Sequence, residues 1–125
     1  MTFRVTQFLN RSTTEVQVEF SAELDLLIGI GNIFVKSTLS NIPDLTVKSV
    51  VITETVLTVS LSPQVPIALY YIEFISTETQ LFQDIDGNRI QEDDKTNRIY
   101  FVGLERQNEV RTSMLENISP IFNVE

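Results

Sequence analysis

The densest group of side chains that could hold a metal ion lies in an acidic stretch between residues 84 and 94. Asp84, Asp86 and Asn88 stand at alternate positions, and Ca²⁺ prefers such oxygen ligands. An EF-hand loop counted from Asp84 needs glycine sixth and glutamate twelfth, but these places hold Arg89 and Lys95. The alternative is a tight turn at the Asp-Gly-Asn sequence, whose residues tolerate positive φ. We favour the turn and keep Asp84, Asp86 and Asn88 as candidate ligands of a loose Ca²⁺ site.

The rest of the chain offers no nucleophile with an activating base. Its 125 residues include no histidine and no cysteine, which excludes a Ser-His-Asp triad, a thiolate nucleophile and cysteine-ligated metal centres. G-x-S-x-G, S-x-x-K and glycine-rich phosphate-loop motifs are also missing from the sequence. Glu92, Asp93 and Asp94 are loop neighbours, and nothing sets them across a cleft as glycoside hydrolysis requires. We therefore expect no enzymatic activity and no cofactor.

The charge of the chain limits its partners. Nine basic and 17 acidic residues give a net charge of −8, with the acidic excess greatest over residues 73–97. Such a surface repels phosphate backbones and anionic membranes, so we expect neither nucleic acid nor membrane as a partner. The longest apolar run, residues 26–30, is too short to cross a bilayer, and the first ten residues do not have the pattern of a secretory signal. These features predict a soluble domain made in a cytoplasm, unless a leader has been removed.

Alternating apolar and polar residues predict an all-β fold. Val, Ile and Thr supply 13 residues each against two alanines, a bias that favours strands. Short alternating segments separated by turn residues are typical of a half-buried antiparallel sandwich or small barrel. Residues 24–30 are a loop or a helical turn, and a short strand pair at 81–83 and 89–91 flanks the acidic turn. The main strands are expected at 3–9, 14–20, 32–39, 45–52, 56–62, 69–76 and 97–104.

The aromatic residues divide by their phase in these strands. Two tyrosines, Tyr71 and Tyr100, have the outward phase and are candidates for a contact surface. The others have mainly the inward phase and are expected in the core: Phe3, Phe8, Phe20, Phe34, Tyr70, Phe74 and Phe101.

The last 20 residues, 106–125, have a different pattern from the predicted sandwich at 1–105. Asn108 is a candidate N-cap for a short helix that closes near Pro120. Such a helix is marginal alone and must pack on something, either the sandwich itself or a partner. Its apolar face is the main candidate interface and consists of Val110, Met114, Leu115 and Ile118.

Three segments resemble those of bacterial immunoglobulin-like and fibronectin-III-like domains. TEVQVEFS at 14–21 is similar to their second strand, and LFQDIDGNRI at 81–90 to one of their hairpins. LSP at 61–63 followed by YYIEF at 70–74 resembles the entry to their sixth strand, where Tyr70 matches the corner tyrosine. QVPIAL replaces the usual glycine-containing approach to that tyrosine. The resemblance implies an immunoglobulin-like sandwich of about seven strands, to which the capping and periodicity of the last residues add a short C-terminal helix.

Domains of this kind occur in phage virions and on bacterial surfaces, mostly as spacers or docking modules. The resemblance therefore implies a structural protein of a bacteriophage particle, in the tail, baseplate, fibre or head decoration. Its partners would be other virion proteins in an oligomeric assembly. Two alternatives remain open. One is a glycan- or receptor-binding module, with or without Ca²⁺, and the other is a bacterial cell-surface adhesin domain.

Overall fold

The computed structural model describes residues 2–105. This part of the chain is all-β, with one 3₁₀ turn and no α-helix. None of its helical segments has the length and apolar character needed to span a membrane. The strands are β1 (Val5–Ser12), β2 (Glu15–Phe20), β3 (Ile33–Ser37), β4 (Val47–Thr53), β5 (Val56–Leu61), β6 (Leu69–Phe74) and β7 (Arg98–Val102), and the 3₁₀ turn η1 covers Ile30–Asn32.

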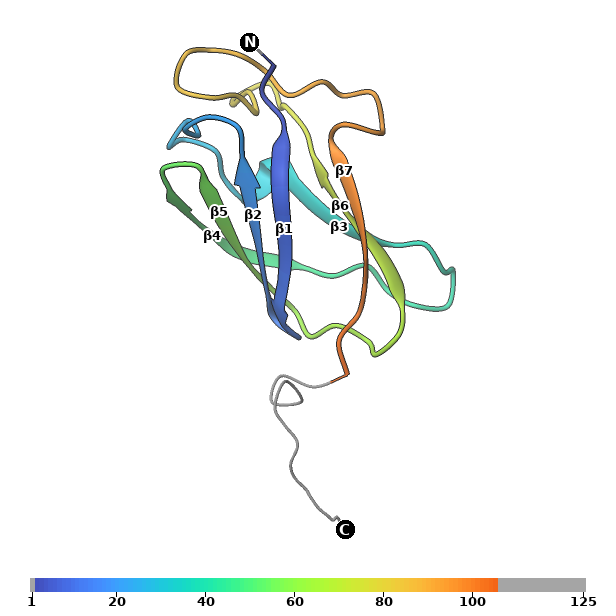
Figure 1. The fold of residues 1–125 in the computed structure, drawn as a ribbon. Coiled ribbons are helices and arrows are strands. Elements are labelled where there is room, and N and C mark those ends of the chain that lie inside the picture. The colour runs from blue at the N-terminus through green and yellow to red at the C-terminus, as the bar shows by residue number, and fades with distance from the viewer. Residues whose placement is uncertain (1, 106–125) are drawn as a thin grey trace.

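The strands form two antiparallel sheets (Figure 1). One sheet has the order β1-β2-β5-β4 and the other β3-β6-β7. Strands β1 and β2, and likewise β4 and β5, are neighbours in sequence that pair as hairpins. The first described residues and the end of β7 lie toward opposite ends of the molecule (Figure 1). The prediction of an all-β fold is therefore confirmed.

A single apolar core joins the two sheets. Alternate residues of β2 and β5 turn inward from one sheet, and alternate residues of β3 and β6 from the other. At the end of the sandwich where the chain begins, the ring of Phe82 packs among three other rings. Its centroid lies 5.0 Å from the ring centroid of Phe74, 5.5 Å from that of Phe20 and 6.1 Å from that of Phe3. Phe82 belongs to the long connection between β6 and β7, so this loop is anchored by the core.

Two buried amides hold the ends of the same loop. Asn32 donates from Nδ2 to the carbonyls of Ile75 and Gln80, each over 2.9 Å. Asn97 donates from Nδ2 to the Phe74 carbonyl over 3.0 Å, directly before β7 begins. Because buried amides need such partners, the acidic loop between β6 and β7 has fixed attachment points although much of it is exposed.

Several sequence expectations need correction. Residues 81–83 and 89–91 form no strand pair; a lone bridge joins Gln83 to Arg89. The possible helical turn at 24–30 is a loop held by a bridge from Leu24 to Asp84, and the 3₁₀ turn comes only at its end. Phe34 is 41% exposed, because β3 presents it on the side opposite to the buried Ile33 and Val35. The expected C-terminal helix lies outside the described residues.

Tyr70 ties the start of β6 to the preceding loop. It is fully buried, its ring lies 5.6 Å from that of Phe101, and its hydroxyl oxygen accepts a 2.8 Å hydrogen bond from the Val65 N–H. This contact joins Val65 in the QVPIAL segment to the start of β6, and the Ile67 N–H and the Gln64 side chain add further hydrogen bonds that hold the loop.

We expect Tyr70→Phe to lower the free energy of unfolding by about 1–3 kcal/mol, because the Val65 N–H would lose its partner. Urea denaturation of the variant and the natural chain measures this difference. Tyr100→Phe, at an exposed position, serves as the control and should change the free energy of unfolding little. Equal stability of Tyr70→Phe and the natural chain would contradict this account.

Candidate interaction surface

The outward side of the β3-β6-β7 sheet is a candidate contact surface, which we call the outer face. Successive side chains of a strand point to opposite sides of the sheet. The residues that alternate with the core residues along β3, β6 and β7 therefore lie together on this side. The pairing aligns them in three rows across the strands. The rows are Phe34, Glu73 and Arg98; Lys36, Tyr71 and Tyr100; and Leu69 with Val102.

Much of the outer face is apolar. Phe34 and Leu69 are each about two-fifths exposed, and Tyr100 and Val102 are each 54% exposed. Tyr71 and Tyr100 lie directly opposite each other on β6 and β7, with ring centroids 5.3 Å apart and planes tilted by 46°. Exposed aromatic and aliphatic side chains gathered on one face are typical of interaction sites.

The cations of the outer face lie against its rings. The Arg98 guanidinium carbon is 4.6 Å from the centre of the Tyr71 ring, and the Lys36 Nζ is 5.4 Å from that of Phe34. Such cation–π contacts hold the charged groups over the faces of the rings. The outer face thus combines aromatic area with positive charge in a chain whose net charge is −8.

An ion pair fixes Arg98 in this position. Its Nε donates to Oε2 of Glu73 over 2.9 Å, and its Nη2 lies 3.3 Å from Oδ1 of Asp94. Glu73 is only 8% exposed because the arginine covers it. The hydrogen bond to Glu73, with the charges of Glu73 and Asp94, raises the pKa of the Arg98 guanidinium above its ordinary value. Arg98 is therefore held across the surface by charge on one side and a ring on the other.

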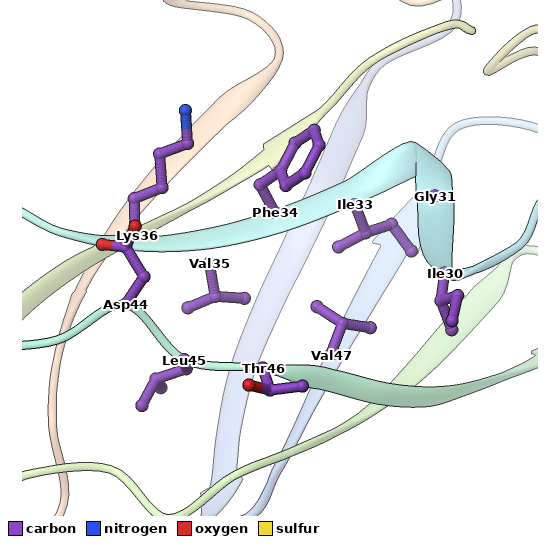
Figure 2. Close-up of a pocket in the computed structure, with 10 residues that line it drawn as sticks. All are labelled: Ile30, Gly31, Ile33, Phe34, Val35, Lys36, Asp44, Leu45, Thr46 and Val47. Atoms are coloured by element: carbon purple, nitrogen blue, oxygen red, sulfur yellow. The ribbon is translucent and has the colours of Figure 1, made fainter.

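A second feature is an apolar groove between β3 and β4, with a volume of about 320 Å³ (Figure 2). Side chains of Ile33, Val35 and Val47 point into the space between the two strands (Figure 2). The groove closes where the Leu45 N–H donates to the Val35 carbonyl over 3.0 Å. Nearby, Asp44 Oδ1 accepts a 2.9 Å bond from the Ser37 N–H. These contacts cover part of the free edge of β3.

The candidate Ca²⁺ ligands form a tight turn. Asp84 is 1% exposed, and its Oδ1 accepts bonds from the N–H groups of Asp86 and Asn88, over 3.0 and 2.8 Å. Its Oδ2 accepts from Asn88 Nδ2 over 3.0 Å, and Gly87 takes a φ of 86°. Within residues 2–105 no three acidic side chains are grouped closely enough to hold a metal ion. Asp84 therefore acts in the structure as a turn-forming residue, and its role as a Ca²⁺ ligand stays a prediction.

Sequence reasoning found part of this surface. It identified Tyr71 and Tyr100, which the structure brings together. It did not identify Arg98 or Lys36, although the same alternation that places Tyr71 outward could have placed them. The helical interface predicted at Val110, Met114, Leu115 and Ile118 lies outside the described residues.

Comparison with known proteins shows a likeness in fold. No protein family and no curated protein matches the chain. Several solved structures do. Among them are domains 1–6 of surface layer protein SbsC, with a TM-score of 0.67 and 19% identity, and the N-terminal part of the bacterial S-layer protein SbsC, with a TM-score of 0.66 and 20% identity. Each match covers 83% of this chain, but only 14% and 24% of the respective SbsC chains. This chain therefore has the fold of part of a bacterial surface protein.

We expect Arg98→Met to lower the thermal midpoint, because Glu73 would keep its shielded position without a cation. The double variant Arg98→Met/Glu73→Leu should recover much of the loss, since it removes both charges. Lys36→Met is the matched control: residues 2–105 supply no ion pair for Lys36, so the midpoint should hardly move. An unchanged thermal midpoint in Arg98→Met would show that the ion pair between Arg98 and Glu73 does not stabilise the fold.

Because protein N–H groups already bind the Asp84 carboxylate, we expect the thermal stability of the chain not to depend on Ca²⁺. The thermal midpoint of the full chain should be the same in Ca²⁺ and in EDTA, while Asp84→Ala should lower it in both, because two backbone N–H groups lose their acceptor. A Ca²⁺-dependent rise that disappears in Asp84→Ala would instead support the Ca²⁺-binding alternative. Differential scanning calorimetry separates the two outcomes.

Proposed function

We propose that this chain is a non-enzymatic structural module of a bacterial cell-surface assembly, acting through contacts with other proteins. The observation that carries the proposal is the outer face, where exposed apolar side chains surround the fixed Arg98–Tyr71 contact. A preformed apolar surface with immobilised charges loses little side-chain entropy on association, which favours protein contacts.

We further infer that the sandwich is of the immunoglobulin type. The strand order β1-β2-β5-β4 and β3-β6-β7 corresponds to the A-B-E-D and C-F-G sheets of constant-type domains. Tyr70, whose hydroxyl binds the backbone of Val65 just upstream, has the place of the corner tyrosine. Both observations support the assignment that the sequence motifs implied.

The cell surface is a better-supported location than the virion. The similar solved structures are surface-layer proteins, and this likeness favours the alternative over the phage role that the sequence motifs implied. Because fold alone does not determine function, the outer face has to carry the argument for what this chain contacts.

A glycan-binding module would use the same two tyrosines as stacking platforms. Arg98 already lies over the Tyr71 ring, which leaves the more exposed Tyr100 as the main platform. The surrounding Phe34, Leu69 and Val102 add area that suits a protein surface better than a sugar.

If the outer face mediates assembly, Leu69→Ser/Val102→Ser should weaken self-association of the full chain. These two side chains are cross-strand neighbours, and their loss removes apolar area from one end of the surface. Sedimentation velocity over a range of concentrations measures the effect, which we expect to be roughly tenfold or more in the dissociation constant.

The matched control is Leu26→Ser/Leu27→Ser, because these leucines are even more exposed, at 72% and 76%, but lie in the loop after Leu24. Equal weakening in both double variants would mean that general hydrophobicity, and not the outer face, drives association. A full chain that stays monomeric at all concentrations would contradict self-assembly.

A further inference from the structure

Four strands lie at the margins of the two sheets, and three of them carry some protection against pairing with another chain. Strand β1 has register shifts at both ends, between Val5 and Gln7 and between Asn10 and Ser12. Strand β4 has one shift, after Val47 and next to the charged Lys48, and pairs regularly from Ser49 to Thr53. Part of the edge of β3 is covered by the contacts from Asp44 and Leu45 described above. Bulges and covering loops of this kind prevent edge-to-edge association.

Strand β7 lacks this protection. It pairs with β6 in continuous register from Arg98 to Val102, without a shift. Figure 1 shows β7, in orange, at the margin of its sheet. A regular edge strand with exposed apolar side chains is a ready template for another strand.

The hydrogen bonds at both ends of β7 determine which backbone groups point outward. The Asn97 carbonyl accepts from the Phe74 N–H over 2.9 Å, and the Gly103 N–H donates to the Ala68 carbonyl over 2.7 Å. Antiparallel pairing alternates between bonded and non-bonded pairs, so Ile99 and Phe101 also face β6. The N–H and C=O groups of Arg98 and Tyr100 therefore face the free edge.

Part of this edge is already occupied. The Val102 carbonyl accepts a 3.1 Å bond from Asn10 Nδ2, and the Leu104 N–H donates to Gln64 Oε1 over 2.9 Å. Within residues 2–105 no such partner meets the outward backbone groups of Arg98 or Tyr100. The open part of the edge is thus short and centred on Ile99.

We propose that β7 pairs antiparallel with β7 of a second copy of this chain, with Arg98 opposite Tyr100 of the second copy. The pairing would join two three-stranded sheets into one continuous sheet. This inference rests on the proposed function and names the partner and the register of one contact in the assembly.

This register is the one that satisfies the open edge. It uses both outward groups of Arg98 and both of Tyr100 in each copy, and leaves Val102 bound to Asn10. It also sets each guanidinium beside a tyrosine ring of the other copy, on the same side of the sheet as Tyr71. Because Arg98 is already neutralised by Glu73 and Asp94, the two arginines can approach each other.

The identity of the partner follows from the symmetry of the contact. A two-fold axis through the pair of Ile99 residues makes each copy supply the donors that the other accepts, so the same edge serves both sides. Arg98 and Tyr100 lie two residues apart on β7. In this register Arg98 of each copy is therefore opposite Tyr100 of the other copy. Since each copy carries a net charge of −8, association should strengthen as salt screens the repulsion.

The test is Tyr100→Pro in the full chain. Proline removes the Tyr100 N–H, which faces outward and is not part of the β6–β7 ladder, so the fold should survive while edge pairing is lost. Tyr100→Lys is a second variant that keeps the backbone and places a cation opposite Arg98 of the second copy. Val51→Ser is the matched control, because Val51 is 58% exposed and lies on β4, an edge strand of the other sheet.

We expect both Tyr100 variants to weaken the dimer at least roughly tenfold in sedimentation equilibrium, while Val51→Ser leaves it nearly unchanged. Circular dichroism checks that each variant is folded. In the natural chain, exchange of the Tyr100 amide hydrogen should slow as protein concentration and dimer fraction rise.

Self-association that is unchanged in folded Tyr100→Pro and Tyr100→Lys would overturn this inference but leave the proposed function standing through another surface. A Tyr100 amide protected equally at all concentrations would also overturn it, because another part of the same chain would then cover the edge. A chain that never associates would contradict the dimer and the self-assembly in the proposed function together.

Discussion

The alternation of side chains along β6 determines both the stability and the exposed surface of this protein. Tyr70, Ile72 and Phe74 are fully buried and join the two sheets, while Tyr71 and Glu73 between them face the other way. Because β6 is the central strand of its sheet, β3 and β7 must follow the same phase. A shift of the strand register by one residue would expose the core aromatic side chains and bury the ion pair. The core and the outer face therefore both depend on the same register.

The ion pair between Glu73 and Arg98 shows how the surface depends on this constraint. A carboxylate that is shielded from water needs a partner, and the pairing of β6 with β7 supplies one directly across the strands. In holding the carboxylate, Arg98 also comes to lie over Tyr71. The buried charge therefore fixes the position of Arg98 on the outer face, and side chains that are already fixed lose less entropy when proteins associate.

The acidic residues of the loop between β6 and β7 shape the backbone of that loop. Asp84 is used inside a turn, and Asp93 forms hydrogen bonds to Lys95 and Thr96 that shape the approach to β7. The hydrogen bonds to Asp93 lower its pKa, so this carboxylate stays charged in moderately acidic solution. Two of the nine basic residues, Lys36 and Arg98, lie over aromatic rings of the outer face.

The sequence by itself determined the class of fold and the positions of the seven strands, because period-two alternation and turn residues are local properties. It also indicated that Tyr71 and Tyr100 point outward. It could not predict that Phe34 is exposed, since a single apolar residue in a β-branched run fits either side of a strand. Nor could it predict the contact between Glu73 and Arg98, or which sheet edge is open. Those depend on strand order and register, which pair residues 25 positions apart through the tertiary structure.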